Sequence, residues 1–515
     1  MFARVLGATP RGVDALFVTV EVDRLRAQLP SVTVVGLPDT AVREARERIL
    51  AAARRMGLPP EPANIVINLS PADERKEGAS LDLPMAVAFL AAAGLLPPEV
   101  AGGVLLVGEL SLEGRLLPVR GVLPMVLAAR RRGLEAVIVP RANADEAAVV
   151  SGVRTLPAES LGQVVRHLGG SDPLEPHPRP EGDGSPLDPL PLDLADVVGQ
   201  EAARRALEVA AAGGHHLLFM GPPGSGKSML ARRLPGILPE LDDDEALATT
   251  CVYSVSTRIP RPRGLIRRRP FRAPHHTIST AALVGGGSNP QPGEISLAHN
   301  GVLFLDELME FRRDVLESLR QPLEDGRVTI ARSRTALTFP SRFQLVAAAN
   351  PCPCGYLGET SRECVCTPAM IHRYRSRLSG PLVDRIDLQV LVPPVPWREL
   401  SDSRRGEPSD AVRRRVAAAR RLQARRMADT GLGCNAAMGP REIERWARPD
   451  GAGKRLMERA ASTLGLSARA FHRILRVART LADLEGSEKV AVHHVAEAIS
   501  WRALDREDLP RAAGT

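Results

Sequence analysis

Aromatic residues, lysine and cysteine are all scarce in this chain of 515 residues. Aromatic side chains make up 3% of it, so we do not expect stacking on nucleic-acid bases to dominate any binding. The longest apolar stretch, residues 83–98, is interrupted by Pro84 and Gly94 and falls short of the roughly 20 uninterrupted residues of a membrane span. The first 19 residues lack the basic and apolar regions of a signal peptide. We therefore expect a cytoplasmic protein without a membrane partner.

Positive charge comes almost entirely from arginine. Lys and Arg total 68 against 60 Asp and Glu, which gives a net charge of +8, yet lysine occurs only at Lys76, Lys227, Lys454 and Lys489. Such a composition is typical of a genome biased toward Arg, Ala and Gly codons, so each lysine that persists is informative. The net charge suits a polyanionic partner but does not identify one.

The chain is long enough for two or three domains, and its composition is that of a soluble globular protein. A segment rich in proline and glycine, residues 169–192, predicts a linker. Short β-branched runs alternate with Ala-rich helical patterns on both sides of it, whereas only helical patterns follow residue 396. We predict an α/β domain (residues 1–168), the linker, a second α/β domain (193–395) and a helical domain (396–515).

A phosphate-binding loop follows a short apolar strand at residues 216–220. Residues 221–228 read G-P-P-G-S-G-K-S, which fits G-x-x-x-x-G-K-[ST], and a helical pattern comes next. The backbone N–H groups of such a loop surround phosphate oxygens, Lys227 reaches the β and γ phosphates, and Ser228 can ligate Mg²⁺. The predicted ATP-binding residues are Gly221, Pro222, Pro223, Gly224, Ser225, Gly226, Lys227 and Ser228.

Two further strands end in polar residues. The apolar run 301–305 ends in Asp306 and Glu307, and the run 343–349 ends in Asn350. We expect Asp306 to hold the Mg²⁺ shell, Glu307 to polarise the attacking water and Asn350 to orient that water, because hydrolysis at such a site depends on positioning and charge stabilisation. The sequence therefore predicts ATP hydrolysis.

Four stretches carry a resemblance to a known family. They read R-A-P-H-H at residues 272–276, P-G-E-I-S-L-A-H at 292–299, N-P-C-P-C-G at 350–355 and S-G-P-L-V-D-R-I-D at 379–387. Together they resemble the magnesium-chelatase-like AAA+ ATPases of the ComM (YifB) type over essentially the full length. The resemblance implies an AAA+ module with a helical lid, assembled as a hexameric ring with inserts that face the pore.

The same resemblance implies roles for three arginines. Arg385 would be the arginine finger that projects into the ATP site of the neighbouring subunit, unless it pairs locally with Asp384 or Asp387. Arg469 would be the sensor 2 residue of the lid, with Arg473 as the alternative one helical turn later.

DNA is the expected partner, with recombination proteins as further candidates. The resemblance implies contacts from His275 and His276 and from Arg332 and Arg334, which lie on a predicted hairpin at residues 328–339. No acidic residue occurs between Glu245 and Glu294, while seven arginines do, which is typical of a phosphate footprint or of a solvated surface; they are Arg258, Arg261, Arg263, Arg267, Arg268, Arg269 and Arg272.

The first domain resembles the Lon protease fold through residues 76–80, K-E-G-A-S, and residues 108–118. Ser80 stands where the nucleophile of a Lon protease would be. The lysine that acts as its base in that family is missing, because residues 122–125 read V-L-P-M. A hydroxyl without a base is a poor nucleophile at neutral pH, so we predict that the domain is not proteolytic.

The leading hypothesis is an ATP-driven hexameric motor on DNA, a helicase or branch-migration factor in natural transformation and recombination. A chelatase-type motor that drives metal insertion by a partner is the alternative, disfavoured because such subunits are not expected to carry a Lon-like domain. An ATP-dependent protease is a third alternative, which the missing base disfavours.

Four of the six cysteines lie within fifteen positions, at Cys352, Cys354, Cys364 and Cys366. Two Cys-x-Cys pairs flank a loop that contains Gly355 and Gly358, so four thiolates can converge on one structural zinc ion. A disulfide or free thiols are the alternatives, although a cytosolic location disfavours disulfides. Because the loop directly follows Asn350, we expect metal loss to impair assembly or hydrolysis rather than nucleotide binding.

Overall fold

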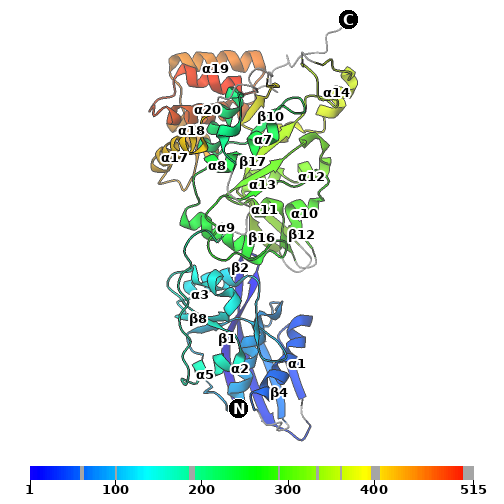
Figure 1. Cartoon of the computed structure of the whole chain (residues 1–515), viewed down its shortest axis with the longest axis vertical. Helices are drawn as coiled ribbons and strands as arrows, with labels where there is room; N and C mark the ends of the chain where they lie inside the picture. The colour runs from blue at the N-terminus through cyan, green and yellow to red at the C-terminus, as the bar shows by residue number, and fades with distance from the viewer. Residues whose placement is uncertain are drawn as a thin grey trace.

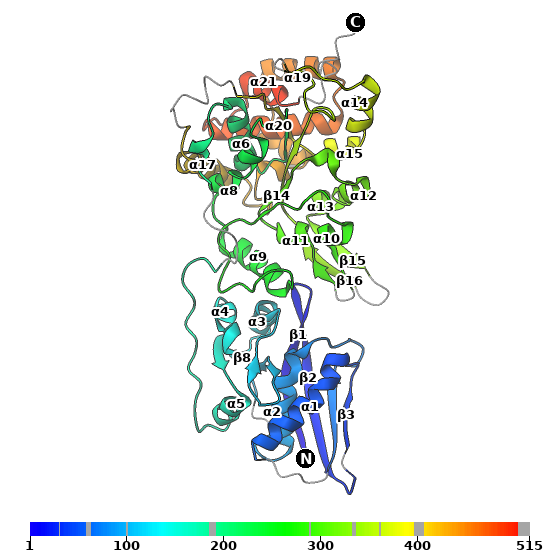
Figure 2. The same cartoon turned by 45° about the vertical axis from the view of Figure 1, so that its right-hand side comes forward.

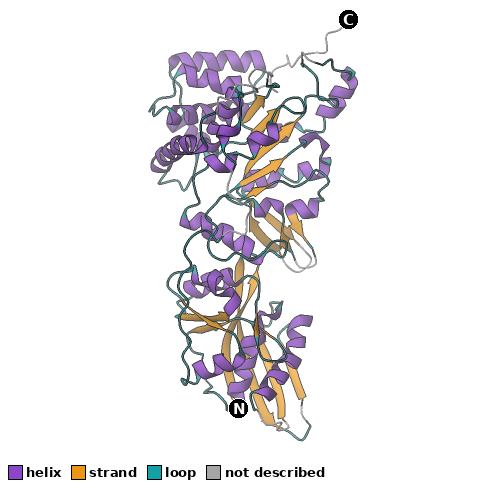
Figure 3. Ribbon diagram, in the orientation of Figure 1, coloured by secondary structure: helices purple, strands orange, loops and turns teal. Residues whose placement is uncertain are grey.

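The structure is a computed structural model of the whole chain, and it describes residues 1–29, 31–57, 63–98, 101–184, 192–287, 290–331, 336–359, 362–395 and 406–502. It is elongated, with the N-terminal domain at one end and the helical domain at the other (Figure 1). The predicted α/β class is confirmed, and the helices C-terminal to the second sheet gather at the far end (Figure 3). Within the described residues, no helix combines the length and apolar content that crossing a bilayer requires.

The first domain is built on a seven-stranded sheet in the order β3-β4-β2-β1-β5-β8-β9. Successive residues of a strand face opposite sides of the sheet and pack into different hydrophobic cores. In β5, Leu106 packs with α1, α2 and α5, and Leu105 packs with α3 and α4. The long apolar stretch forms α2, whose residues are all buried. The strands and helices are β1 Phe2–Arg11, β2 Asp14–Arg26, β3 Ser31–Val35, α1 Thr40–Arg55, β4 Ala63–Ser70, η1 Ala79–Leu81, α2 Asp82–Ala92, β5 Val104–Leu106, β6 Glu109–Leu110, β7 Leu116–Leu117, α3 Val122–Arg131, β8 Ala136–Pro140, η2 Arg141–Asn143, α4 Ala144–Ala148, β9 Arg154–Ala158 and α5 Leu161–Leu168.

The second domain contains a parallel five-stranded sheet in the order β11-β14-β17-β10-β18. All its strands point the same way, so the residues that follow β10, β14 and β17 meet at one edge. Its elements are η3 Leu194–Asp196, α6 Glu201–Gly213, β10 Leu217–Met220, α7 Lys227–Ala231, α8 Leu234–Ile237, α9 Asp243–Val255, β11 Phe271–Arg272, α10 Thr280–Val284, β12 Gly285–Gly286, β13 Gln291–Pro292, α11 Glu294–Leu297, β14 Val302–Leu305, η4 Leu308–Glu310, α12 Arg313–Glu317, α13 Arg320–Asp325, β15 Arg327–Ala331, β16 Ala336–Pro340, β17 Gln344–Ala349, α14 Pro368–Arg375, α15 Gly380–Val383 and β18 Leu388–Leu391.

The helical domain packs on one face of this sheet. Residues of its helices share a single core with α6 and with alternate residues of the strands, such as Phe219 and Phe304. Its elements are α17 Ser409–Arg426, η5 Asn435–Ala437, α18 Pro440–Trp446, α19 Gly451–Leu464, α20 Ala468–Leu484 and α21 Val492–Ser500. The lid is therefore continuous with the core that carries the phosphate-binding loop.

A buried interface joins the first two domains through α3 and α9. The Glu146 carboxylate is 2% exposed there, and it accepts hydrogen bonds from the Ser254 hydroxyl and, at 3.2 Å, from the backbone N–H of Leu123. The β1–β2 turn also reaches the second domain, where Gly12 faces the ring of Phe339 in β16 (Figure 2). The first domain thus contacts one strand of the hairpin that we expect to face DNA.

The described part of the predicted linker is bound to both domains. His177 N donates to Thr155 O at 2.8 Å, and Gly184 N donates to Leu265 O at 2.9 Å. Asp183 pairs with Arg268 at 2.5 Å. Residues 185–191 lie outside the described residues.

Candidate active site

A cavity of about 470 Å³ opens at the sheet edge where β10, β14 and β17 end. Residues from all three strand ends line it, together with the first turn of α7. They are Pro223, Gly224, Ser225, Gly226, Lys227, Ser228, Met229, Asp306, Glu307, Ala348, Ala349 and Asn350. The structure therefore brings together the predicted phosphate loop, the two acidic residues and the amide.

Glycine is required at three positions of the loop. Gly224 and Gly226 have φ angles of 78° and 89°, in the left-handed region that favours glycine. A side chain on Gly221 would place its Cβ 2.1 Å from the carbonyl oxygen of Val392, directly after β18. The Ser225 hydroxyl is buried and has no hydrogen-bond partner among the described residues. This glycine-rich loop with a buried unpaired hydroxyl fits the phosphates of ATP.

The Lys227 side chain folds onto the phosphate-binding loop. Its Nζ donates to Gly221 O and Pro222 O, each at 2.7 Å, and to Asn350 Oδ1 at 3.2 Å. Burial lowers the pKa of Lys227 to about 8, while the negative charge of Asp306 opposes that shift. The lysine is thus held at the floor of the cavity, and phosphate oxygens would replace the two carbonyls as its partners.

Ser228 and Asp306 form the pair expected of a magnesium site. The Ser228 hydroxyl donates to Asp306 Oδ2 at 2.6 Å. Both oxygens are hard ligands of the kind that Mg²⁺ prefers, and Mg²⁺ at such a site keeps waters and binds the phosphates as well. The donor set fits the predicted ion, which would neutralise charge on the phosphates.

Glu307 adopts a left-handed backbone conformation, with a φ of 51°. This region is unfavourable for a side chain with a Cβ and is found at functional sites. The His276 Nδ1 lies 3.2 Å from Glu307 Oε2. Sequence reasoning assigned His276 to DNA and missed this contact, because no local pattern links two residues on different strand ends.

The structure gives Arg385 a partner that the sequence did not identify. The Arg385 side chain, 9% exposed, pairs with Glu324 of α13 and donates to Pro381 O at 2.5 Å. Its carboxylate partner is therefore neither Asp384 nor Asp387, since Asp387 binds Arg473 at 2.7 Å, but Arg385 does pair within its own chain, as the alternative to the finger role expected. The side chain of the predicted finger therefore contacts residues of its own subunit.

The two candidates for sensor 2 differ in their surroundings. Arg473, on α20, is partly buried against the start of β18, where it donates to Arg385 O at 2.9 Å. Arg469, one turn earlier on α20, is exposed. Arg473 is therefore committed to the amino end of the sheet, opposite the cavity, and Arg469 stays the candidate for sensor 2.

The four clustered cysteines converge. Their sulfur atoms all lie within 4.8 Å of one another, with Cys352 Sγ at 3.4 Å from Cys354 Sγ and at 3.6 Å from Cys364 Sγ. Tetrahedral zinc with bonds of about 2.3 Å places its sulfurs about 3.8 Å apart, so the set fits the ion. All four are free thiols in the structure.

The cysteine loop rests on the phosphate loop. Gly355 has a φ of 86°, and a Cβ on it would lie 2.5 Å from Cδ of Pro223. Arg375 of α14 also donates to Pro351 O at 3.2 Å. A metal that fixes this loop would therefore support the wall of the ATP cavity as well as Asn350, so its loss should also weaken nucleotide binding, which differs from the expectation drawn from the sequence.

The arginine-rich segment is largely neutralised within the chain. Four of its seven arginines have carboxylate partners: Arg267 with Asp243, Arg268 with Asp183, Arg269 with Glu245 and Arg272 with Glu294. Fewer of these arginines are therefore available to bind DNA phosphates than the sequence indicated. Arg332 and Arg334 lie outside the described residues, between β15 and β16.

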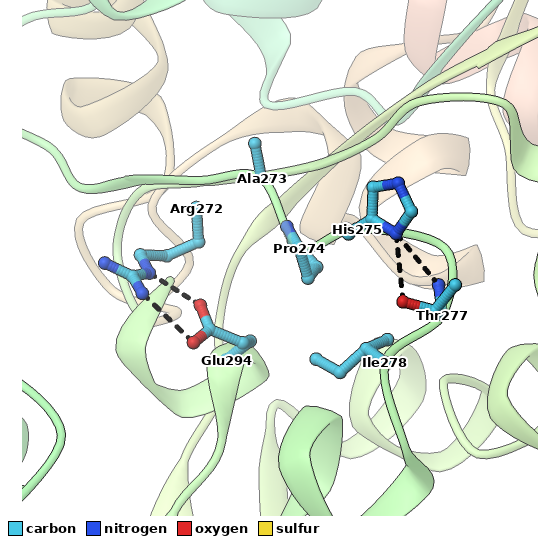
Figure 4. Close-up of a pocket in the computed structure, with 7 residues that line it drawn as sticks. All are labelled: Arg272, Ala273, Pro274, His275, Thr277, Ile278 and Glu294. Atoms are coloured by element: carbon cyan, nitrogen blue, oxygen red, sulfur yellow. Dashed lines mark hydrogen bonds and ion pairs between the residues drawn. The ribbon is translucent and has the colours of Figure 1, made fainter.

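A second cavity, of about 330 Å³, lies beside His275 (Figure 4). Arg272 and Glu294 form a bidentate ion pair along one side of it, at 2.7 and 3.0 Å. His275 Nδ1 lies 3.0 Å from the Thr277 hydroxyl. Because the two charges of the ion pair satisfy each other, we assign this cavity no phosphate group.

The Lon-like motif lacks an activated nucleophile. The Ser80 hydroxyl is 3% exposed and donates to Ala8 O at 3.0 Å. The Lys76 amine donates to Pro71 O instead. This arrangement agrees with a domain that does not cleave peptides.

Glu485, His493 and His494 form a second group with metal-ligand chemistry. His494 Nδ1 accepts from the Ala491 N–H at 2.9 Å, so its Nε2 carries the proton that Glu485 accepts at 2.9 Å. Metal binding at Nε2 would displace that proton. We therefore assign the group to capping of α21.

Comparisons with known proteins cover nearly the whole chain. Residues 193–400 match the family profile described as "Magnesium chelatase, subunit ChlI", residues 20–143 match "Subunit ChlI of Mg-chelatase", and residues 406–502 match "Magnesium chelatase, subunit ChlI C-terminal". The chain is 45% identical to the competence protein ComM of Haemophilus influenzae over 98% of each chain, and 44% identical to YifB of Escherichia coli over 96% of each. It is also 33% identical to the Lon protease of Roseiflexus castenholzii, over 38% of this chain and 24% of that one.

Proposed function

The chain belongs to the magnesium-chelatase-like AAA+ family of the ComM/YifB type, and from this premise we propose that it is an ATP-hydrolysing motor that acts on DNA. The function is helicase or branch-migration activity that helps to incorporate single-stranded DNA in natural transformation and homologous recombination. The observation that carries the proposal is the cavity in which Lys227, the Ser228–Asp306 pair and Glu307 meet. The Haemophilus relative is named a competence protein, which supports the biological context.

Each residue of the cavity has a part in the proposed reaction. Lys227 and the loop N–H groups hold the phosphates, and Ser228 and Asp306 hold Mg²⁺. Glu307 polarises the attacking water, and Asn350 orients it. Arg385 completes the site of the neighbouring subunit, so the active form is an oligomer, and the family resemblance implies a ring of six subunits.

The first test is ATPase turnover with single-stranded DNA, duplex DNA, branched DNA or none. A DNA motor is expected to hydrolyse ATP several-fold faster with at least one of these DNAs. Lys227→Ala should lose ATP binding, whereas Glu307→Gln should bind ATP and hardly hydrolyse it, because Lys227 contacts the ground-state phosphates and Glu307 acts only on the water. Turnover by Glu307→Gln at the unmutated rate would contradict the role given to Glu307.

A chelatase motor is the alternative that this test separates. The profile matched by residues 20–143 carries the chelatase name, so the fused first domain alone does not exclude that function. A chelatase motor is expected to hydrolyse ATP without any response to DNA. Branch migration is then measured directly, with a labelled four-way junction and Glu307→Gln as the inactive control.

Contact with DNA is tested at the β15–β16 hairpin. Substituting Arg332 and Arg334 together should weaken binding and reduce the slope of log K against log salt by roughly 1.5, since each phosphate contact contributes about 0.7 to 0.9. Basal ATPase should stay intact. An unchanged salt slope would count against contact of these arginines with phosphates.

A further inference from the structure

The lid holds the backbone of the segment that carries Arg385. Arg473, on lid helix α20, donates from one nitrogen, Nη1, both to Arg385 O at 2.9 Å and to Asp387 Oδ1 at 2.7 Å. Two residues later the Gln389 N–H donates to Trp501 O at 2.7 Å, just beyond α21. The lid therefore grips the chain at Arg385 and again at Gln389.

A second lid arginine acts between these two points. Arg502 is 1% exposed, and its Nη1 donates to Ile386 O at 2.8 Å. The backbone carbonyls of Arg385 and Ile386 thus each accept from a lid guanidinium. Rotation of this segment relative to the lid would break both hydrogen bonds.

Asp387 makes the arrangement rigid. It is 4% exposed, and its other oxygen, Oδ2, accepts from the His216 N–H at 3.1 Å, directly before β10, the strand that pairs with β18. Burial alone would raise the pKa of Asp387, but Arg473 and the two neighbouring histidines bring it well below its usual range. The carboxylate is charged, and a buried charge of this kind needs its counterion.

The Arg385 side chain is held differently from its backbone. Its carboxylate partner Glu324 has a side chain that is 54% exposed, whereas the Arg385 side chain is 9% exposed, so the pair is open to solvent only on the Glu324 side, where another anion can replace that carboxylate. The backbone is held by groups of the lid, whereas the guanidinium has two partners, the solvent-facing Glu324 carboxylate, which another anion can replace, and Pro381 O of its own segment. This is what a finger needs if it is to reach a neighbouring phosphate from a fixed base.

We propose that Arg473 is a positioning residue for Arg385: it ties the finger's backbone to the lid, so that the lid of one subunit sets the place of the finger in the next subunit's ATP site. The inference rests on the proposed ring motor with Arg385 as its finger. A shift of α20 in one subunit would then change hydrolysis in its neighbour rather than in itself.

The test compares kinetic constants of full-length Arg473→Ala, Arg385→Ala and the double variant. Arg473→Ala should lower kcat at least about tenfold and change KM for ATP less than about twofold, because the finger acts on charge that develops in the transition state. The double variant should be no slower than Arg385→Ala, since Arg473 acts only through Arg385. If the two losses multiply instead, the positioning role is wrong.

Arg479→Ala is the matched control. Arg479 is a buried arginine of α20, paired with Asp483 at 3.0 Å, and it lies further along the helix, away from the Arg385 segment. It should lower thermal stability as Arg473→Ala does while leaving kcat largely intact. Equal loss of kcat in both variants would mean that a loosened lid, and not the finger, explains the effect. Arg473→Lys, which retains the charge, provides the measurement if the alanine variant does not fold, and its kcat should lie between the other two.

Mixed rings locate the effect. Arg473→Ala subunits mixed with Lys227→Ala subunits should regain activity, because a Lys227→Ala neighbour supplies a well-placed finger to an intact ATP site. No regain under verified co-assembly would overturn the inference. If Arg385→Ala itself hydrolyses ATP at the full rate, the finger assignment of the proposed function fails, and the role of Arg473 fails with it.

Discussion

The His276 Nδ1 lies 3.2 Å from Oε2 of Glu307, the residue that we expect to polarise the attacking water. His276 follows β11, and Glu307 follows β14, the neighbouring strand of the same sheet. His275 contacts Thr277 instead. One of two adjacent histidines in the expected DNA-contacting insert is therefore joined to the catalytic centre.

We expect His276 to hold Glu307 away from the water when DNA is absent. His276→Ala should raise turnover without DNA about two- to fivefold and reduce further stimulation by DNA, because removing one hydrogen-bond partner of a carboxylate changes its energy by about a kilocalorie per mole or less at an exposed site. Steady-state ATPase with and without DNA measures both effects.

His275→Ala is the control: its exposed ring lies 4.0 Å from that of His276, and its Nδ1 contacts Thr277 and not Glu307. It should leave turnover without DNA unchanged. If His276→Ala and His275→Ala behave alike, or if neither raises the basal rate, the contact does not restrain Glu307.

Affinity for ATP should fall with rising pH because of Lys227. Its pKa is lowered to about 8 before the nucleotide binds. Only the protonated amine attracts phosphate, so above pH 8 binding must take up a proton, and affinity should decrease up to about tenfold per pH unit. Below pH 8 the lysine is already charged and affinity should be level.

Calorimetric titration between pH 7 and pH 9.5, in two buffers with different heats of protonation, measures this proton uptake. Folding stability depends on pH in the opposite sense to that of a lysine whose pKa is raised on folding. Because the folded-state pKa is lower than the usual value, the charged amine costs stability below pH 8, and that cost disappears as pH rises toward about 10.4. A pH-independent affinity for ATP would contradict the burial of Lys227.

The predicted finger should show its effect only in the assembled ring. Arg385→Ala should retain ATP affinity and lose at least about a hundredfold in kcat, since a finger of this kind contributes 10³ to 10⁵ in related systems. Glu324→Gln should instead release Arg385 from its ion pair and raise turnover per subunit at protein concentrations at which the ring is assembled. Turnover of both variants, measured across a dilution series, shows whether each effect depends on assembly of the ring. A Glu324→Gln variant with less activity than the unmutated chain would mean that Glu324 supports the finger rather than restrains it.

The strand ends that carry the site were predictable from the sequence. The three apolar runs form β10, β14 and β17. The phosphate loop, the pair Asp306-Glu307 and Asn350 follow directly after these strands. Each run is local, and parallel strands bring their carboxyl ends to one edge, so the cavity follows from the order of elements alone. The proximity of Lys227 to Asn350, at 3.2 Å, is a consequence of that topology.

The partners of the arginines were not predictable in this way. Arg385 and its ion-pair partner Glu324 are 61 residues apart in the sequence. Arg268 pairs with Asp183 of the linker, 85 residues away. Such pairs leave no periodic signal, because the fold alone decides which carboxylate lies nearby. The same is true of the β1–β2 turn, whose contact with Phe339 joins a residue of the first domain to the second.

The last prediction concerns zinc at Cys352, Cys354, Cys364 and Cys366. Protein purified without chelator should contain about one zinc ion per chain, because the four sulfurs have the separation of a tetrahedral site. The double variant Cys364→Ser and Cys366→Ser should lose the metal, whereas Cys434→Ser, in the helical domain, should retain it. Since Gly355 rests on Pro223, the double variant should bind ATP several-fold more weakly as well as hydrolyse it more slowly. Elemental analysis and ATP titration measure the two effects, and metal-free protein with full ATP affinity and full turnover would show that no ion holds this loop.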